Sequence, residues 1–143
     1  MERWNGNYEK IEVQNATDLN IKEFVNSGLE PAYKDGSRVV EFKLAKPEEF
    51  VRVHGTENRV KPWLMKAEDI KGLSVLEIKN KFNLPNIPSS ISKVEVPIGT
   101  NMRMSMVGSN KFGEAFGAIQ YEIRMPEGVD LPDNWFSIIG EIK

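Results

Sequence analysis

The sequence predicts an α+β domain, in which short N-terminal helices pack on a twisted antiparallel β-sheet formed mainly by the C-terminal half. Three observations support this prediction. The length of 143 residues suits a single domain. Apolar residues make up 40% of the chain, which is enough for one hydrophobic core. Strand-like segments separated by glycine and proline turns follow one another from residue 92 onward, whereas the helical patterns precede them.

The N-terminal part divides into a polar segment and a first helix. Residues 1–16 are mostly polar and are predicted to be a lead-in or linker, so that one domain would cover residues 17–143. Within it, Asp18 suits the N-cap of an amphipathic helix over 18–28, and Gly28 suits its end.

Two strands and a second helical region follow. Strands are predicted over residues 37–45 and 50–55, both of which have strand composition. Residues 66–83 have a helical pattern, in which Ser74 and Glu77 have the spacing of a capping box. The candidate core contacts of this region are Leu73, Leu76, Ile78 and Phe82.

The chain after residue 91 is predicted to be β-structure throughout. Its strands are predicted over residues 92–97, 100–108, 117–125 and 134–143. In the second of them Met102, Met104 and Met106 share a face, because side chains alternate along a strand. We expect these methionines to fill the core.

The composition excludes several classes of chemistry. The chain has no cysteine, which rules out disulfides, thiolate nucleophiles and cysteine-bound zinc. One histidine is too few for the usual imidazole-based metal sites, so we expect no metal and no cofactor. A net charge of −2 does not favour a broad nucleic-acid-binding surface, although it leaves a local basic cleft open. No stretch reaches the roughly 20 apolar residues that span a bilayer, so no membrane segment is expected.

Arg52 and His54 are the first candidate site residues. They lie two residues apart on the strand predicted over 50–55 and therefore point to the same side, while Val51 and Val53 point into the core. An arginine and the only histidine of the sequence thus form a compact polar group. The alternative, which spacing alone favours, is an exposed strand face with two solvated side chains.

Trp63 stands beside two basic residues, Arg59 and Lys61, and follows a proline that extends the local backbone. A tryptophan in this setting can stack on a base or a nicotinamide ring while the cations meet phosphates. The alternative is that Trp63 is simply a core residue.

The segment from 111 to 123 contains the last candidates. Gly113 and Gly117 bracket a loop that enters a strand, and glycines let the backbone approach a ligand closely. Gln120 follows on this strand, facing the same side as Ala118 and Glu122. An ordinary strand with a solvent-facing glutamine is the alternative, and spacing alone favours it.

Four sequence segments in this order resemble the tuberculosis necrotizing toxin family of NAD glycohydrolases, which are C-terminal domains of bacterial polymorphic toxins. The segments are Arg52-Val53-His54-Gly55, Leu84-Pro85, Val96-Pro97-Ile98-Gly99-Thr100 and Phe112-Gly113…Gly117-Ala118-Ile119-Gln120-Tyr121. The resemblance covers roughly residues 50–140. The sequence departs from the family pattern where Glu114, Ala115 and Phe116 interrupt the glycine-rich loop, and where Lys81-Phe82-Asn83 replaces an arginine before the Leu-Pro.

The resemblance implies a metal-independent hydrolase of the nicotinamide–ribose bond of NAD(P). The domain would be the toxic tail of a larger secreted effector, as in contact-dependent inhibition, acting in the target-cell cytoplasm and blocked by a cognate immunity protein. In the family the arginine and the glutamine line the NAD pocket, which implies that Arg52 grips the diphosphate and Gln120 holds ribose hydroxyls or the attacking water. His54 would orient either group. The substrate contacts expected besides these are Arg59, Lys61, Trp63, Phe112, Gly113 and Tyr121.

Three other functions stay open. In a metal-independent ribonuclease toxin acting on tRNA or rRNA, His54 would be the general base, and Arg52 or Lys61 would stabilise the phosphorane charge. Nucleic acid is a partner only under this alternative. An ADP-ribosyltransferase would use the same NAD pocket. A non-enzymatic binding module, such as an immunity or adaptor protein, would make the motifs coincidental.

Overall fold

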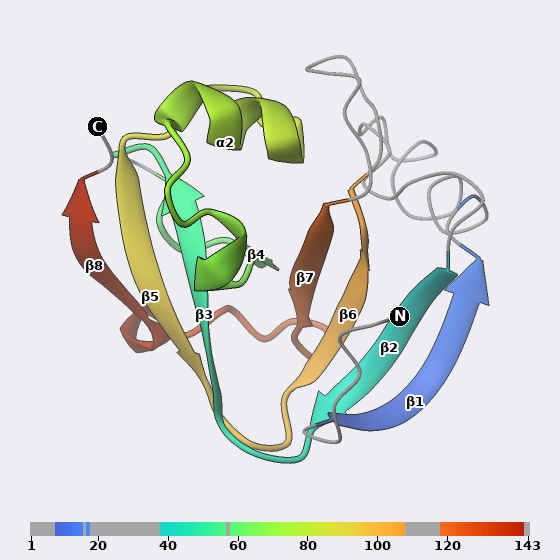
Figure 1. Cartoon of the computed structure of the whole chain (residues 1–143). Coiled ribbons are helices and arrows are strands. Elements are labelled where there is room, and N and C mark those ends of the chain that lie inside the picture. The colour runs from blue at the N-terminus through green and yellow to red at the C-terminus, as the bar shows by residue number, and fades with distance from the viewer. Residues whose placement is uncertain (1–7, 16, 18–37, 57, 108–117, 142–143) are drawn as a thin grey trace.

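In the computed structural model, the described residues form two antiparallel sheets and one α-helix (Figure 1). The structure describes residues 8–15, 17, 38–56, 58–107 and 118–141. The predicted α+β single domain, with a sheet built mainly from C-terminal strands, is confirmed. The five-stranded sheet consists of β1 (Tyr8–Asn15), β2 (Arg38–Leu44), β6 (Asn101–Met106), β7 (Ile119–Arg124) and β4 (Trp63–Leu64), in that spatial order. The three-stranded sheet consists of β3 (Glu48–His54), β5 (Ser90–Val96) and β8 (Phe136–Glu141).

The two sheets pack face to face and enclose a first core (Figure 1). Side chains alternate along each strand, so every second residue of β2, β6 and β7 enters this core. Met102 and Met104 are fully buried in it, as predicted from their spacing, and Met106 is partly buried. The core is completed by Val40, Phe42, Leu44, Phe50, Leu64, Val94, Val96, Tyr121, Ile123 and Phe136.

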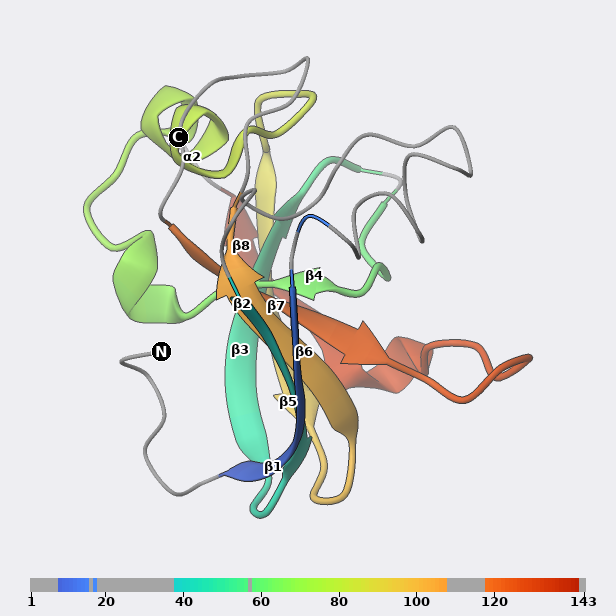
Figure 2. The ribbon, with the colours of Figure 1, turned by 90° about the vertical axis from the view of Figure 1, so that its right-hand side faces the viewer.

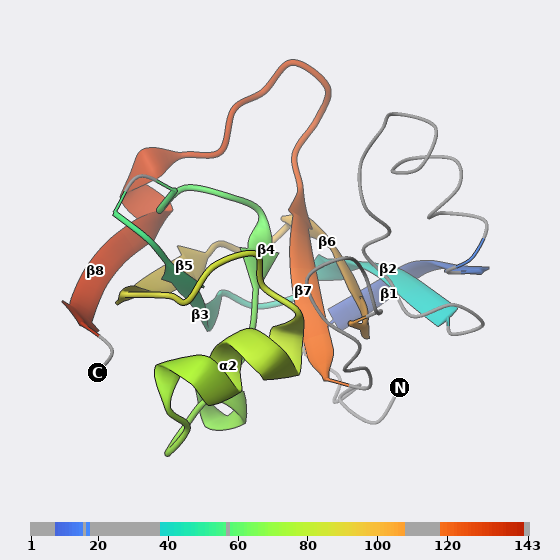
Figure 3. The same ribbon diagram turned by 90° about the horizontal axis from the view of Figure 1, so that it is seen from above.

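A second core lies on the other face of β3, under helix α2 (Val75–Phe82) (Figure 3). Val51 and Val53 of β3 pack there with Ile78 and Phe82 of the helix. The strand is therefore buried on both faces, since Phe50 belongs to the first core. The expected alternation is confirmed, but the face that carries Arg52 and His54 is buried rather than exposed.

The predicted helical region over 66–83 consists of two separate pieces, the 3₁₀-helix η3 (Ala67–Asp69) and α2. Gly72 has a φ of 79° between them, a conformation that ends a right-handed helix. The capping box is present, because Ser74 and Glu77 bond each other's backbone N–H groups. Leu76 is exposed, so its predicted core contact is wrong: it lies two residues from Ile78, which puts it on the opposite side of the helix.

The N-terminal predictions have mixed outcomes. Residues 8–15 of the predicted lead-in form β1, which pairs with β2 at the edge of the sheet, so this part of the chain is not a linker. Val13 on this strand is 41% exposed. The helix predicted over 18–28 lies outside the described residues. A second 3₁₀-helix, η4 (Asp133–Trp135), precedes β8. Within the described ranges, no helix has the length and apolarity needed to cross a membrane.

Candidate functional site

Strand β4 joins the two sheets and brings Trp63 next to β7 (Figures 2 and 3). Met65, just after β4, exchanges two backbone hydrogen bonds of 2.9 Å with Val51 of β3. On its other side β4 pairs with β7, so that Trp63 lies opposite Glu122. A segment two residues long thus fixes the position of Trp63 relative to both sheets.

The face of the five-stranded sheet opposite the first core carries polar side chains, and we call it the polar face. Its described residues alternate with core residues along β2, β4, β6 and β7. They are Glu41, Lys43, Trp63, Asn101, Arg103, Ser105, Gln120, Glu122 and Arg124, together with the buried Val39 of β2. Residues paired across antiparallel strands are close neighbours on one face. The polar face therefore consists of three cross-strand rows, which are Ser105–Gln120, Glu41–Arg103–Glu122–Trp63 and Lys43–Asn101–Arg124.

Gln120 and Trp63 are brought together on this polar face. Gln120 lies two residues before Glu122 on β7, and Glu122 is directly opposite Trp63. This diagonal separation is ~7–8 Å between backbone positions, within reach of an aromatic ring. Both side chains are partly buried, which leaves each of them part of its surface for a ligand.

A charged network occupies the middle row of the polar face. The Nε of Arg103 donates to Glu41 at 2.7 Å, and its Nη1 lies 3.6 Å from Glu122. Arg124 lies 3.5 Å from the second carboxylate oxygen of Glu122. Arg103 and Glu122 are 3% and 6% exposed, so this ion network is largely withdrawn from water. No local sequence motif marks these residues, although their alternation with methionines and Tyr121 places them on the face of Gln120.

Arg52 is engaged by the protein backbone. Its Nη1 donates to the carbonyl of Trp63 at 2.9 Å, and its Nε and Nη2 donate to the carbonyl of Asn58 at 3.3 and 3.0 Å. The side chain is buried, and burial lowers the pKa of the guanidinium to about 10, which keeps it charged at neutral pH. Arg52 therefore holds the segment that leads into β4 and with it the backbone of Trp63.

His54 is also enclosed. Its Nε2 lies 2.7 Å from the hydroxyl of Ser92, and its Nδ1 lies 2.6 Å from the carbonyl of Gly55. A carbonyl only accepts, so the neutral ring carries its proton on Nδ1 and accepts the Ser92 hydroxyl proton at Nε2. His54 is 3% exposed and Ser92 is fully buried. In this geometry the imidazole supports the end of β3 and is withheld from a substrate.

We predict that His54 makes folding stability depend on pH. Burial lowers its pKa below the ordinary 6.5, and the charges of Arg52 and Arg59 act in the same direction, against the hydrogen bond to Gly55. The unfolded chain then binds more protons than the folded one as the pH falls below about 6.5, so stability is full above that value and decreases below it. Urea unfolding of the wild type at pH 7.5 and 5.5 should show this decrease. In His54→Gln the decrease should be smaller, and an identical slope in both proteins would contradict the prediction.

The remaining predicted residues have separate places. Arg59 donates to the carboxylate of Asp133 and to the carbonyl of Phe136, which ties the segment before β4 to β8. Lys61 is exposed on that segment. Tyr121 is fully buried in the first core against Phe50, with ring centroids 4.9 Å apart, so it faces away from Gln120. Its expected contact with a substrate does not fit this position. Phe112 and Gly113 lie outside the described residues.

Three of the four sequence segments that carry the resemblance meet at the second core. Val53, Leu84 and Ala118 all pack in or against this cluster, although they come from distant parts of the chain. Val107 donates to the carbonyl of Ala118 at 2.7 Å, which fixes the start of β7. The fourth segment, the turn over 96–100, lies at the opposite end of β5, where β3 begins.

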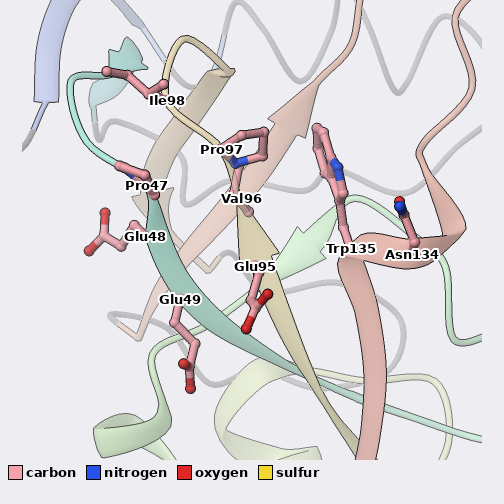
Figure 4. A pocket seen from close by; sticks show the side chains of 9 residues that line it. All are labelled: Pro47, Glu48, Glu49, Glu95, Val96, Pro97, Ile98, Asn134 and Trp135. Carbon is pink, nitrogen blue, oxygen red and sulfur yellow. The ribbon is translucent and has the colours of Figure 1, made fainter.

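A pocket of about 580 Å³ lies beside this turn (Figure 4). It is lined by residues 47–49, 95–98 and 134–135. Trp135 lies on one side of the pocket, beside Pro97. Glu95 and Glu49 extend from β5 and β3 below these two residues. None of the predicted site residues lines this pocket.

Among the described residues, no group of three or more histidine, aspartate or glutamate side chains is placed to hold a metal ion. No family model matches the chain, and neither the curated proteins nor the solved structures give a significant match.

Proposed function

We propose that this domain hydrolyses the nicotinamide–ribose bond of NAD(P) at the polar face, with Gln120 as its catalytic residue. The observation that carries the proposal is that Trp63 and Gln120, from distant parts of the sequence, lie on one face beside each other. The resemblance to the necrotizing toxin family adds the rest of the proposal. The domain then acts as the toxic tail of a larger secreted protein, in the cytoplasm of a target cell, and an immunity protein neutralises it.

The chemistry of this reaction suits a site without an acid–base pair. Nicotinamide leaves from a pyridinium as a neutral molecule, so the leaving group needs no proton. The transition state resembles an oxocarbenium ion, and the enzyme mainly positions the ribose and the water. The amide of Gln120 has one acceptor and two donors, which suits it to hold ribose hydroxyls or the attacking water. The indole of Trp63 offers a flat apolar surface to the nicotinamide ring.

Arg52 takes a different part in this proposal from the one expected from the sequence. Its guanidinium bonds the Trp63 and Asn58 carbonyls and is a positioning residue for the stacking surface. His54 supports the end of β3, the strand that also carries Arg52. The ribonuclease alternative requires a histidine that reaches a ribose hydroxyl, and the burial of His54 makes us favour the glycohydrolase.

The test is to incubate the purified protein with NAD and, separately, with total RNA, with and without EDTA. We expect free nicotinamide by chromatography, at the same rate in EDTA, and intact RNA. Cleaved RNA with intact NAD would overturn the proposal in favour of a ribonuclease. Labelled ADP-ribose attached to protein would show a transferase instead.

A further inference from the structure

A dinucleotide carries a diphosphate, and the arginine expected to bind it is committed elsewhere. Arginine suits phosphate because its guanidinium presents a fork of donors. Four arginine side chains are described in the structure. Arg52 and Arg59 donate to backbone carbonyls, and Arg103 is buried in the ion network. Arg124 is the fourth: it belongs to the same network through Glu122, but unlike Arg103 its side chain is 41% exposed, on the face of Gln120.

The N-terminus of α2, another common place for a phosphate, is already occupied. The Ser74 hydroxyl accepts from the N–H of Glu77, and the Glu77 carboxylate accepts from the N–H of Ser74 at the same end. This carboxylate would repel an anion. The helix therefore offers no competing site among the described residues.

Arg124 stands in a row that suits a phosphate. Asn101 of β6 is paired with Arg124 and also with Lys43 of β2, so the three side chains lie side by side on the polar face. Neighbouring strands are about 4.8 Å apart, which is close enough for the three groups to act on one ligand. Asn101 and Lys43 are exposed. The row thus presents a guanidinium, an amide and an ammonium group to solvent.

The row also lies on the same face as Gln120, where the phosphates of a substrate held by Gln120 could reach it. Arg124 is on the same strand and the same face, with the row of Glu122 and Trp63 between them. Four residues of a strand span ~13 Å. The guanidinium of Arg124 lies 3.5 Å from the carboxylate of Glu122, so it extends toward the row between the two residues. A substrate with its ribose at Gln120 and its nicotinamide on Trp63 would extend its phosphates toward Arg124.

We infer that Arg124, with Asn101 and Lys43, binds the diphosphate of the dinucleotide. This inference rests on the proposed function. It makes Arg124 the determinant that favours NAD over nicotinamide riboside, which has the same scissile bond and no phosphate. The contact exists before the bond breaks, so its loss should raise KM and leave kcat little changed.

The experiment compares NAD and nicotinamide riboside as substrates of the wild type, Arg124→Gln, Arg124→Lys and Lys71→Gln. Lys71 is exposed in the turn after η3, so it is a control for the loss of one positive charge. In Arg124→Gln the preference for NAD, as a ratio of kcat/KM values, should fall about 10- to 100-fold, the scale of a charge-assisted hydrogen bond. Arg124→Lys should recover part of it, and Lys71→Gln should keep it. An equal loss on both substrates, or no loss on NAD, would overturn the inference.

A binding measurement separates this inference from the proposed function. Calorimetry with ADP-ribose, which retains the diphosphate and cannot be cleaved at the nicotinamide bond, needs no turnover. Weaker ADP-ribose binding by Arg124→Gln than by Lys71→Gln would support diphosphate binding by the row of Arg124, even if the wild type released no nicotinamide. If the wild type did not bind ADP-ribose, or if both variants bound it equally, the inference would be wrong.

Discussion

Gln120→Ala should lower the turnover of NAD by on the order of 10²–10³-fold, the scale of losing one preorganised polar group in a transition state. The fold should stay intact, because Gln120 is partly exposed and lies at the start of β7, outside both cores. KM should change less than kcat, since the amide acts mainly on the ribose and water of the transition state.

The measurement is steady-state nicotinamide release, with unfolding followed in parallel. Glu95→Ala is a matched control, because Glu95 is an exposed polar residue on a strand of the other sheet. We expect the control to retain wild-type kcat. Unchanged turnover and unchanged toxicity in Gln120→Ala, together with loss of RNA cleavage in His54→Ala, would assign the domain to the ribonucleases.

The fold class was predictable from local sequence patterns that are also present in the structure. Alternating methionines predicted the inner face of β6, and Ser74 with Glu77 predicted the start of α2. These signals lie within a few residues of each other, so the sequence contains them directly. Leu76 was misassigned although the helical period already places it on the opposite side of α2 from Ile78. Residues 8–15 were misassigned because their environment depends on the rest of the chain, where they find a pairing partner in β2.

The candidate site was only partly predictable, because it depends on strand pairing between distant segments. Trp63 and Gln120 were selected separately, but their shared face comes from the register between β4 and β7. Alternation along β7 places Arg124 on the face of Gln120, but its row with Asn101 and Lys43 comes from the registers of β2, β6 and β7. Arg52 was assigned to the substrate because alternation gives the direction of a side chain but not what covers it. In the structure the segment before β4 covers it.

Arg52→Ala should have the second large effect. We expect it to lower the free energy of unfolding, and not to weaken substrate binding alone. The substitution removes the hydrogen bonds to the Asn58 and Trp63 carbonyls and leaves a cavity at a buried position. Hydrogen bonds to a charged group typically contribute ~1.5–3 kcal/mol each. The cost comes from partly buried carbonyl groups that lose their donor and from the cavity left by the side chain. The midpoint of urea unfolding should therefore fall strongly.

Arg52→Lys and Arg124→Ala separate this structural role from a loss of charge. A lysine has a single nitrogen and cannot bond both carbonyls as the guanidinium does, so Arg52→Lys should be intermediate in stability. Arg124→Ala removes a partly exposed arginine while Glu122 keeps its contact with Arg103, so it should cost less stability than Arg52→Ala. If Arg52→Ala instead kept wild-type stability and raised only the KM for NAD, Arg52 would be a substrate contact after all. The segment before β4 would then have to move aside when the dinucleotide binds, because it now occupies the guanidinium that the phosphates would need.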